Sequence, residues 1–117
     1  MTEAQKDIVL VYDLRRDRDR RERTLSQVQE QWQAYEHGEW PVQVSEGRIS
    51  RLFFYPHAKQ HMFELDEGAH RSSWVRQGDD SWYVVGWRAR VEHVVFHAPP
   101  PVGNMPFVTR IWIGSTA

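Results

Sequence analysis

The chain has 117 residues, a formal net charge of −1, 40% hydrophobic and 13% aromatic residues, and no cysteine. This length and composition predict a single globular domain over residues 1–117, and they exclude a disordered chain. The absence of cysteine excludes disulfides, zinc–thiolate sites and thiol catalysis, and the small net charge argues against indiscriminate nucleic-acid binding.

The first expected elements are a strand and a helix. Residues 8–12 form an apolar run that predicts a strand, and a helix is expected over 25–36. Thr24 and Gln27 have the spacing of a capping box, which places the helix N-terminus at Thr24, and Gly38 suits a C-terminal cap. The residues that form the expected apolar stripe of this helix are Leu25, Val28, Trp32 and Tyr35.

After Pro41 the sequence is typical of strands. In a first predicted hairpin, Phe53 faces Leu65 and Tyr55 faces Phe63, and the same register sets Arg51 opposite Glu67. These are favourable cross-strand pairs, so we expect this register.

A second hairpin is predicted across the turn at residues 78–80, with Trp74 opposite Val85. Its second strand continues through residues 81–97, and we expect Gly86 to bend it or to divide it in two at a corner. The proline-rich segment 98–106 is expected to cross the molecule in an extended conformation, and residues 107–114 form the last predicted strand.

These elements predict an α+β fold. One main helix packs on a strongly curved antiparallel sheet, like half of a barrel. Such a sheet can hold a ligand on its concave face or pair with a second copy. Because the 94–96 stretch is apolar on both faces, we expect a homodimer whose interface includes Val94, Phe96 and Trp112.

The leading functional hypothesis is a non-enzymatic binding module for a small ligand or a protein partner. The chain has 6 tryptophans, more than an ordinary core of this size needs, and each indole N–H needs a partner when it is buried. We therefore expect an aromatic-lined site on the curved sheet. Its candidate ligand-binding residues are Tyr55, Trp74, Tyr83, Trp87 and His93.

A second hypothesis is nucleic-acid binding. Residues 15–23 hold six arginines among three acids, and arginine binds phosphate in a bidentate manner. The interleaved acids weaken this signal, and a solvated, exposed segment is the simpler interpretation. The residues that would contact nucleic acid within and beyond the Arg15–Arg23 segment are Arg15, Arg18, Arg20, Arg21, Arg88 and Arg90.

A third hypothesis is a histidine-dependent hydrolase or metalloenzyme. Glu92 stands next to His93, and a carboxylate beside a histidine is the minimum for acid–base catalysis. Two histidine pairs with four-residue spacing could bind a divalent metal, but nothing in the sequence brings them together. We therefore assign no catalytic residue, metal ligand or cofactor. The paired histidines are His57 and His61, and His93 and His97.

The sequence also bears on location. No early segment has the basic and apolar parts of a signal peptide, and no apolar run approaches the roughly 20 residues of a membrane span. We expect a cytoplasmic protein without a membrane partner.

Overall fold

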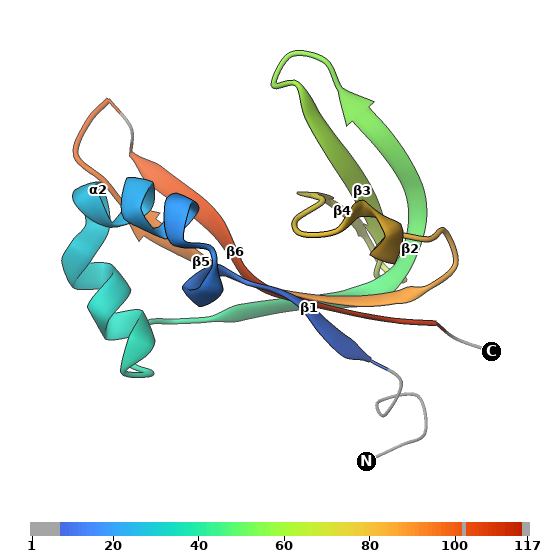
Figure 1. Cartoon of the computed structure of the whole chain (residues 1–117), viewed down its shortest axis with the longest axis horizontal. Helices are drawn as coiled ribbons and strands as arrows, with labels where there is room; N and C mark the ends of the chain where they lie inside the picture. The colour runs from blue at the N-terminus through green and yellow to red at the C-terminus, as the bar shows by residue number, and fades with distance from the viewer. Residues whose placement is uncertain (1–7, 102, 116–117) are drawn as a thin grey trace.

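The computed structural model describes residues 8–101 and 103–115, without the side chains of 21, 23–27 and 105. Over this part of the chain, six strands form one antiparallel sheet in the order β1-β6-β5-β2-β3-β4, which stays open between β1 and β4 (Figure 1). The elements are β1 (Val9–Asp13), the 3₁₀ turn η1 (Leu14–Arg16), α2 (Arg18–Glu36), β2 (Gln43–Tyr55), β3 (Gln60–Asp66), β4 (Arg71–Val75), the 3₁₀ turn η2 (Asp80–Trp82), β5 (Arg88–His97) and β6 (Asn104–Gly114).

The helix begins earlier than the capping-box pattern predicts. Asp17 is the N-cap of α2, and its carboxylate accepts a hydrogen bond from the backbone N–H of Arg20 at 3.3 Å. Thr24 therefore lies inside α2, and the prediction that it caps the helix is wrong. Val28 has φ −138° and ψ 34°, so the helix kinks there. The C-terminal prediction is confirmed, since Gly38 follows the helix with φ +75°.

The described part of the apolar stripe of α2 packs on the sheet as predicted, and the side chain of Leu25 lies outside the described residues. Val28 and Trp32 are each 2% exposed. The Trp32 ring meets Phe96 edge-on, with the ring centroids 6.5 Å apart, and Trp40 beyond the helix meets the same ring at 5.8 Å. In Figure 1, α2 lies over the end of the β5–β6 hairpin. The helix therefore covers only one part of the sheet.

The buried face of β5 changes along the strand. Ala89 and Val91 are buried on one face, whereas Glu92, Val94 and Phe96 are buried on the other. The strand itself stays regular, because the bulge between β5 and β6 lies on β6. The first part of β5 thus faces the core formed with β2 and β3, and the second part faces α2.

This change of face corrects the expected dimer interface. Val94 and Phe96 are each 0% exposed within the single chain. The sequence is apolar on both faces of this strand because one face of β5 is buried in its first part and the opposite face is buried in its second part. These two side chains are therefore not available to a second copy, and Trp112 is half-buried. Dimer formation itself stays a prediction.

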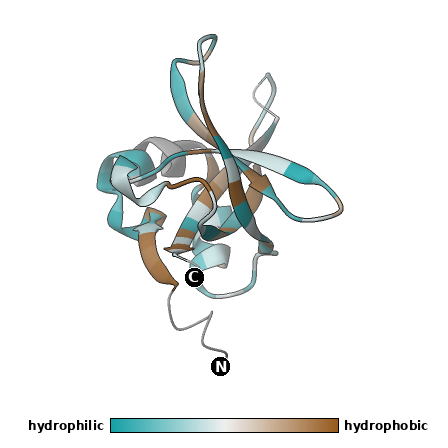
Figure 2. Cartoon of the chain, turned by 90° about the vertical axis from the view of Figure 1, so that its right-hand side faces the viewer, coloured by the Kyte–Doolittle hydropathy of each residue, from teal (hydrophilic) through white to brown (hydrophobic). Residues whose placement is uncertain are grey.

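Strand β2 carries the bend of the sheet. Its residues 43–48 pair with β5, and its residues 48–55 pair with β3. Figure 1 shows the β2–β3 hairpin rising from the plane in which β5 and β6 run. At the bend, a Cβ on Gly47 would lie 2.0 Å from the backbone oxygen of Asp66, so only glycine fits. Apolar segments gather on the strands in the middle of the molecule (Figure 2).

The α+β class and the antiparallel sheet are confirmed. The expected single main helix on a strongly curved, half-barrel-like sheet is confirmed in part, because the helix kinks and the sheet stays open.

The register of the first hairpin differs from the prediction. Tyr55 pairs with Gln60, and Phe53 pairs with Met62. The turn uses only residues 56–59, where the predicted register leaves residues 56–62 unpaired, and this shorter turn moves every predicted pair by three residues along β3. A bulge between Ile49 and Arg51 lies beyond these pairs, farther from the turn.

The second predicted hairpin does not form. Trp74 pairs with Phe63 of β3, and residues 83–87 belong to no strand. Asp79 instead caps η2 by accepting from the Ser81 N–H at 2.9 Å. The predicted long strand is thus reduced to β5.

The proline-rich segment does not cross the molecule. It joins the neighbouring strands β5 and β6, with Ala98 N–H donating to the Gly103 oxygen at 2.9 Å. Within the described residues, no helix has the length and hydropathy of a membrane-spanning segment.

Candidate functional site

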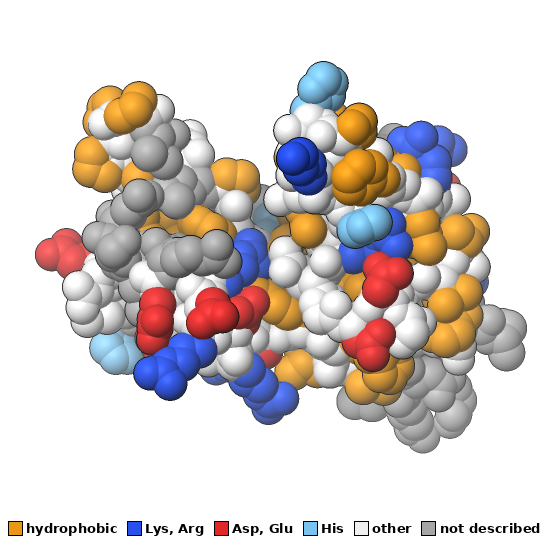
Figure 3. Space-filling model, turned by 45° about the horizontal axis from the view of Figure 1, so that its top comes forward, with side chains coloured by type: hydrophobic (Ala, Val, Ile, Leu, Met, Phe, Trp, Pro, Cys, Tyr) orange, Lys and Arg blue, Asp and Glu red, His pale blue; other side chains and the backbone are white. Residues whose placement is uncertain are grey.

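A cleft of about 200 Å³ lies between β4 and β6, with the start of α2 at its rim. In the space-filling view, the molecule is hollowed between the part that carries α2 and the part that carries the β2–β3 hairpin (Figure 3). Apolar side chains dominate the lining. The lining residues are Arg20, Met62, Ser73, Trp74, Val75, Gln77, Pro106 and Val108.

Trp74 is held in place on two sides. Its ring packs on the imidazole of His93, with centroids 4.6 Å apart. Its indole N–H donates to Ser72 Oγ at 2.8 Å, and that hydroxyl donates to Glu67 Oε2 at 2.8 Å. The tryptophan is half-buried, so a fixed aromatic ring lines the open cleft.

His93 lies behind this tryptophan on β5. Its Nε2 is 3.3 Å from Ser45 Oγ. Burial lowers the pKa of the His93 imidazole, against the smaller opposing effects of Glu67 and Glu92. The neutral ring is therefore favoured, which suits packing against the indole of Trp74.

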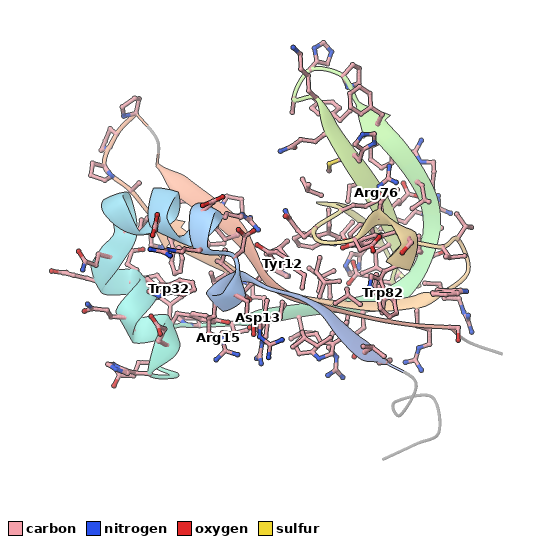
Figure 4. The ribbon with its side chains drawn as sticks, in the orientation of Figure 1. Tyr12, Asp13, Arg15, Trp32, Arg76 and Trp82 are labelled. Carbon is pink, nitrogen blue, oxygen red and sulfur yellow. The ribbon has the colours of Figure 1, made fainter. Side chains whose placement is uncertain are left out.

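Arg20 places a cation at the rim of the cleft. Its guanidinium donates to the Tyr12 hydroxyl at 2.9 Å and to the Val108 backbone oxygen at 3.3 Å. It also lies 5.5 Å from the centre of the Phe107 ring. Burial raises the pKa of Tyr12 to about 12, so this hydroxyl stays protonated and donates to Asp17. Figure 4 shows Tyr12 between the start of α2 and the middle of the sheet.

Two of the predicted ligand-binding residues, Trp74 and His93, come together in this way. The other three do not join them. Tyr55 is 46% exposed at the end of β2, with its ring beside His57. Tyr83 is a core residue whose hydroxyl donates to the Gln77 oxygen at 2.6 Å. Trp87 is half-buried outside the strands and packs against the core.

The cleft also contains residues that the sequence interpretation did not assign to it. The sequence predicts Arg20 as a phosphate contact only. The lining residues without any predicted role are Met62, Ser73, Val75, Gln77, Pro106 and Val108. Val108 lies in a predicted strand with alternating apolar residues, which is a signal for burial but not for a site.

The described candidate nucleic-acid arginines are spread over the molecule, and Arg15, Arg18 and Arg90 pair with acidic side chains. Arg15 binds Asp13 at 2.9 Å, and Arg18 binds Glu22 at 3.0 Å. Arg20 is half-buried in the cleft, so the expectation that the whole Arg15–Arg23 segment is exposed is wrong.

The remaining arginines of this hypothesis lie elsewhere. Arg90 pairs with Glu46 and lies over the Trp112 ring, with the guanidinium carbon 5.7 Å from the ring centre. Arg88 is half-buried, and the side chain of Arg21 lies outside the described residues.

The histidine pairs remain apart from one another. His57 and His61 contact rings at the β2–β3 hairpin, whereas His93 packs on Trp74 and His97 contacts Trp40. No group of three or more metal-binding side chains occurs among the described residues.

Glu92 does not form a dyad with His93. The two neighbours point to opposite faces of β5. Glu92 is 4% exposed and accepts hydrogen bonds from the Tyr35 hydroxyl at 2.8 Å, from Thr109 Oγ1 at 2.8 Å and from Arg110 Nε at 2.9 Å. Burial alone would raise the pKa of Glu92, but these donors outweigh burial and hold the pKa below its usual range. This carboxylate therefore ties α2 to β5 and β6.

No protein-family model matches the chain, and a search of curated proteins finds no relative.

Proposed function

We propose that the chain is a non-enzymatic binding module whose cleft between β4 and β6 takes an apolar group of a small ligand or a protein partner. The observation that carries this proposal is the fixed ring of Trp74. Its face is supported by His93 and its N–H by Ser72, and it still lines an open cleft. A ring that is already immobilised loses little side-chain entropy when a ligand packs on it.

The chemistry of the cleft supports binding more than catalysis. The lining is mostly apolar, with one charged residue, Arg20. His93 has Ser45 as its polar neighbour, and Glu92 lies on the other face of the strand. A few convergent polar groups in an apolar cleft are typical of ligand sites.

The test uses N-acetylphenylalanine methylamide as the probe and follows its binding by saturation-transfer difference NMR on the signals of the probe, so that a variant without Trp74 can also be measured. We expect a saturable signal in the wild type that Trp74→Ala abolishes. Trp82→Ala is the matched control, because Trp82 is 36% exposed on η2 and does not line the cleft. Far-UV circular dichroism checks that both variants are folded. Equal probe binding by both variants would reject the cleft as the site.

A further inference from the structure

Strand β4 has a free edge whose orientation can be derived. It is the last strand of the sheet and pairs only with β3. Arg76 N–H donates to the His61 oxygen at 2.8 Å, and Glu67 N–H donates to the His70 oxygen at 3.0 Å. Hydrogen-bonded positions alternate in an antiparallel ladder, so residues 70, 72, 74 and 76 bond to β3. Ser73 and Val75 therefore direct their N–H and C=O groups away from β3.

The residues that carry these outward N–H and C=O groups line the cleft. Ser73, Trp74 and Val75 line it in succession, so the cleft follows the backbone of the edge strand. Among the described residues, no hydrogen bond from another element reaches the backbone of Ser73 or Val75. Strand β4 also has no bulge, proline or lysine, three of the features that can protect an edge.

We infer that β4 binds an extended peptide segment of a protein partner as an additional strand in this cleft, with an acidic group of the peptide beside Arg20. The inference rests on the proposed function and names its ligand. Outward N–H and C=O groups that repeat every second residue match an extended backbone, which few small molecules reproduce.

Two further observations favour a peptide. The volume of about 200 Å³ is smaller than the roughly 300–1,000 Å³ of pockets that enclose drug-sized ligands, whereas an open cleft lets a chain pass through. Arg20 is the charged residue of the lining, so a carboxylate next to it is favoured.

The probe is a phage library of random heptapeptides, selected on the wild-type protein. Enriched peptides are then synthesised, and their affinities are measured by fluorescence polarisation. Ser73→Pro removes the outward N–H and leaves the ladder with β3 intact, which is the position where an edge strand tolerates proline. Ser73→Ala keeps the N–H and is the matched control. We expect binding at least ten-fold weaker for Ser73→Pro and within two-fold of wild type for Ser73→Ala.

A second test does not depend on the folding of a variant. Two versions of an enriched peptide carry N-methyl groups at alternate residues, in complementary sets. Strand addition predicts that one version loses binding and that the other keeps it, because only one edge of the peptide faces β4. Equal binding of the two versions would overturn the inference, as would a library without enriched peptides. Hydrogen exchange of the Ser73 and Val75 amides should slow when the peptide binds.

The outcomes separate the two proposals. If Trp74→Ala abolishes binding and Ser73→Pro does not, the aromatic cleft stands and strand addition falls. If neither substitution weakens binding, both proposals fall. If the protein forms a dimer, seen as a doubled mass, and the dimer does not bind the peptide, a second copy occupies the edge of β4 instead. This result would also overturn the inference.

Discussion

Replacing Glu92 by glutamine tests how α2 is attached to the sheet. The carboxylate of Glu92 accepts hydrogen bonds from Tyr35 on α2 and from Thr109 and Arg110 on β6. Glutamine keeps the size of the side chain but replaces one acceptor oxygen by an NH₂ group. That group would face the Arg110 guanidinium, so the N–H groups of the arginine lose their acceptor.

The expected loss follows from the burial of the two partners. A hydrogen bond to a charged group contributes about 1.5–3 kcal/mol, and breaking a fully buried ion pair costs about 3–5 kcal/mol. The Glu92 side chain is 6% exposed and that of Arg110 is 33% exposed, so water compensates the arginine in part. We therefore expect Glu92→Gln to lower the free energy of unfolding by about 2–3 kcal/mol.

The control lies on the same face of the sheet. Glu46 pairs with Arg90, but both side chains are more than one third exposed, at 44% and 37%. Glu46→Gln should therefore change the free energy of unfolding by only about 0–1 kcal/mol. Urea denaturation at pH 7 measures both, with the m-value as a check that the unfolded states are comparable. Equal losses in the two variants would refute the buried attachment.

The effect of Glu92 also has a defined pH dependence. The folded-state pKa of Glu92 is below its ordinary value of 4.5, so the folded state binds the proton less readily than the unfolded state. Its stabilisation is therefore present above about pH 4.5 and is lost as the pH falls through the folded-state pKa. The difference between wild type and Glu92→Gln should shrink below pH 4.

Four further predictions concern stability, each measured by urea or thermal denaturation. Trp32→Ala should cost about 3–5 kcal/mol, and an unchanged midpoint would mean that the helix does not pack on β5. Gly47→Ala should cost at least about 1–3 kcal/mol, because the new Cβ meets a backbone oxygen of β3 at 2.0 Å, and a neutral effect would contradict the close approach of β2 and β3. Arg18→Gln should leave the melting temperature nearly unchanged, since its side chain is 81% exposed, whereas Arg20→Gln should lower it through lost contacts with the sheet, and equal effects would argue against those contacts. The pKa of His93 is lower in the folded state than its ordinary value of 6.5 in the unfolded chain, so the wild type should lose stability as the pH falls from 7.5 to 5.5. A loss of the same size in His93→Gln would exclude this histidine as its source.

The elements that the sequence predicts correctly are those with a local pattern. Each of these elements has a repeat of apolar residues that can be read without knowing a distant partner. They are the strand after Ile8, the helix stripe with Val28 and Trp32, and the final strand. The helix begins earlier than the sequence predicts because Asp17 is its N-cap, and aspartate is at least as favourable as threonine at that position. Propensity for a strand at residues 83–87 was overridden by the turn chemistry after Asp79.

The errors in pairing have a different origin. The turn of the first hairpin takes only residues 56–59, where the predicted register leaves residues 56–62 unpaired, so every predicted pair is displaced by three residues along β3. For the candidate site, the aromatic composition indicates that some tryptophans are not ordinary core residues. That Trp74 meets His93 depends on how β3 and β4 fold back across β5, which is a non-local contact without a local signal.

The change of face along β5 has a consequence for how the protein opens. The buried side chains form one cluster, but α2 covers the second part of β5, whereas β2 and β3 form the core against its first part, so these two regions can open with different free energies. The cleft draws Arg20 and Val108 from the first region and Trp74 from the second. A molecule bound in the cleft would hold both regions closed at once. Binding of a ligand at β4 should therefore slow the hydrogen exchange of backbone amides in α2.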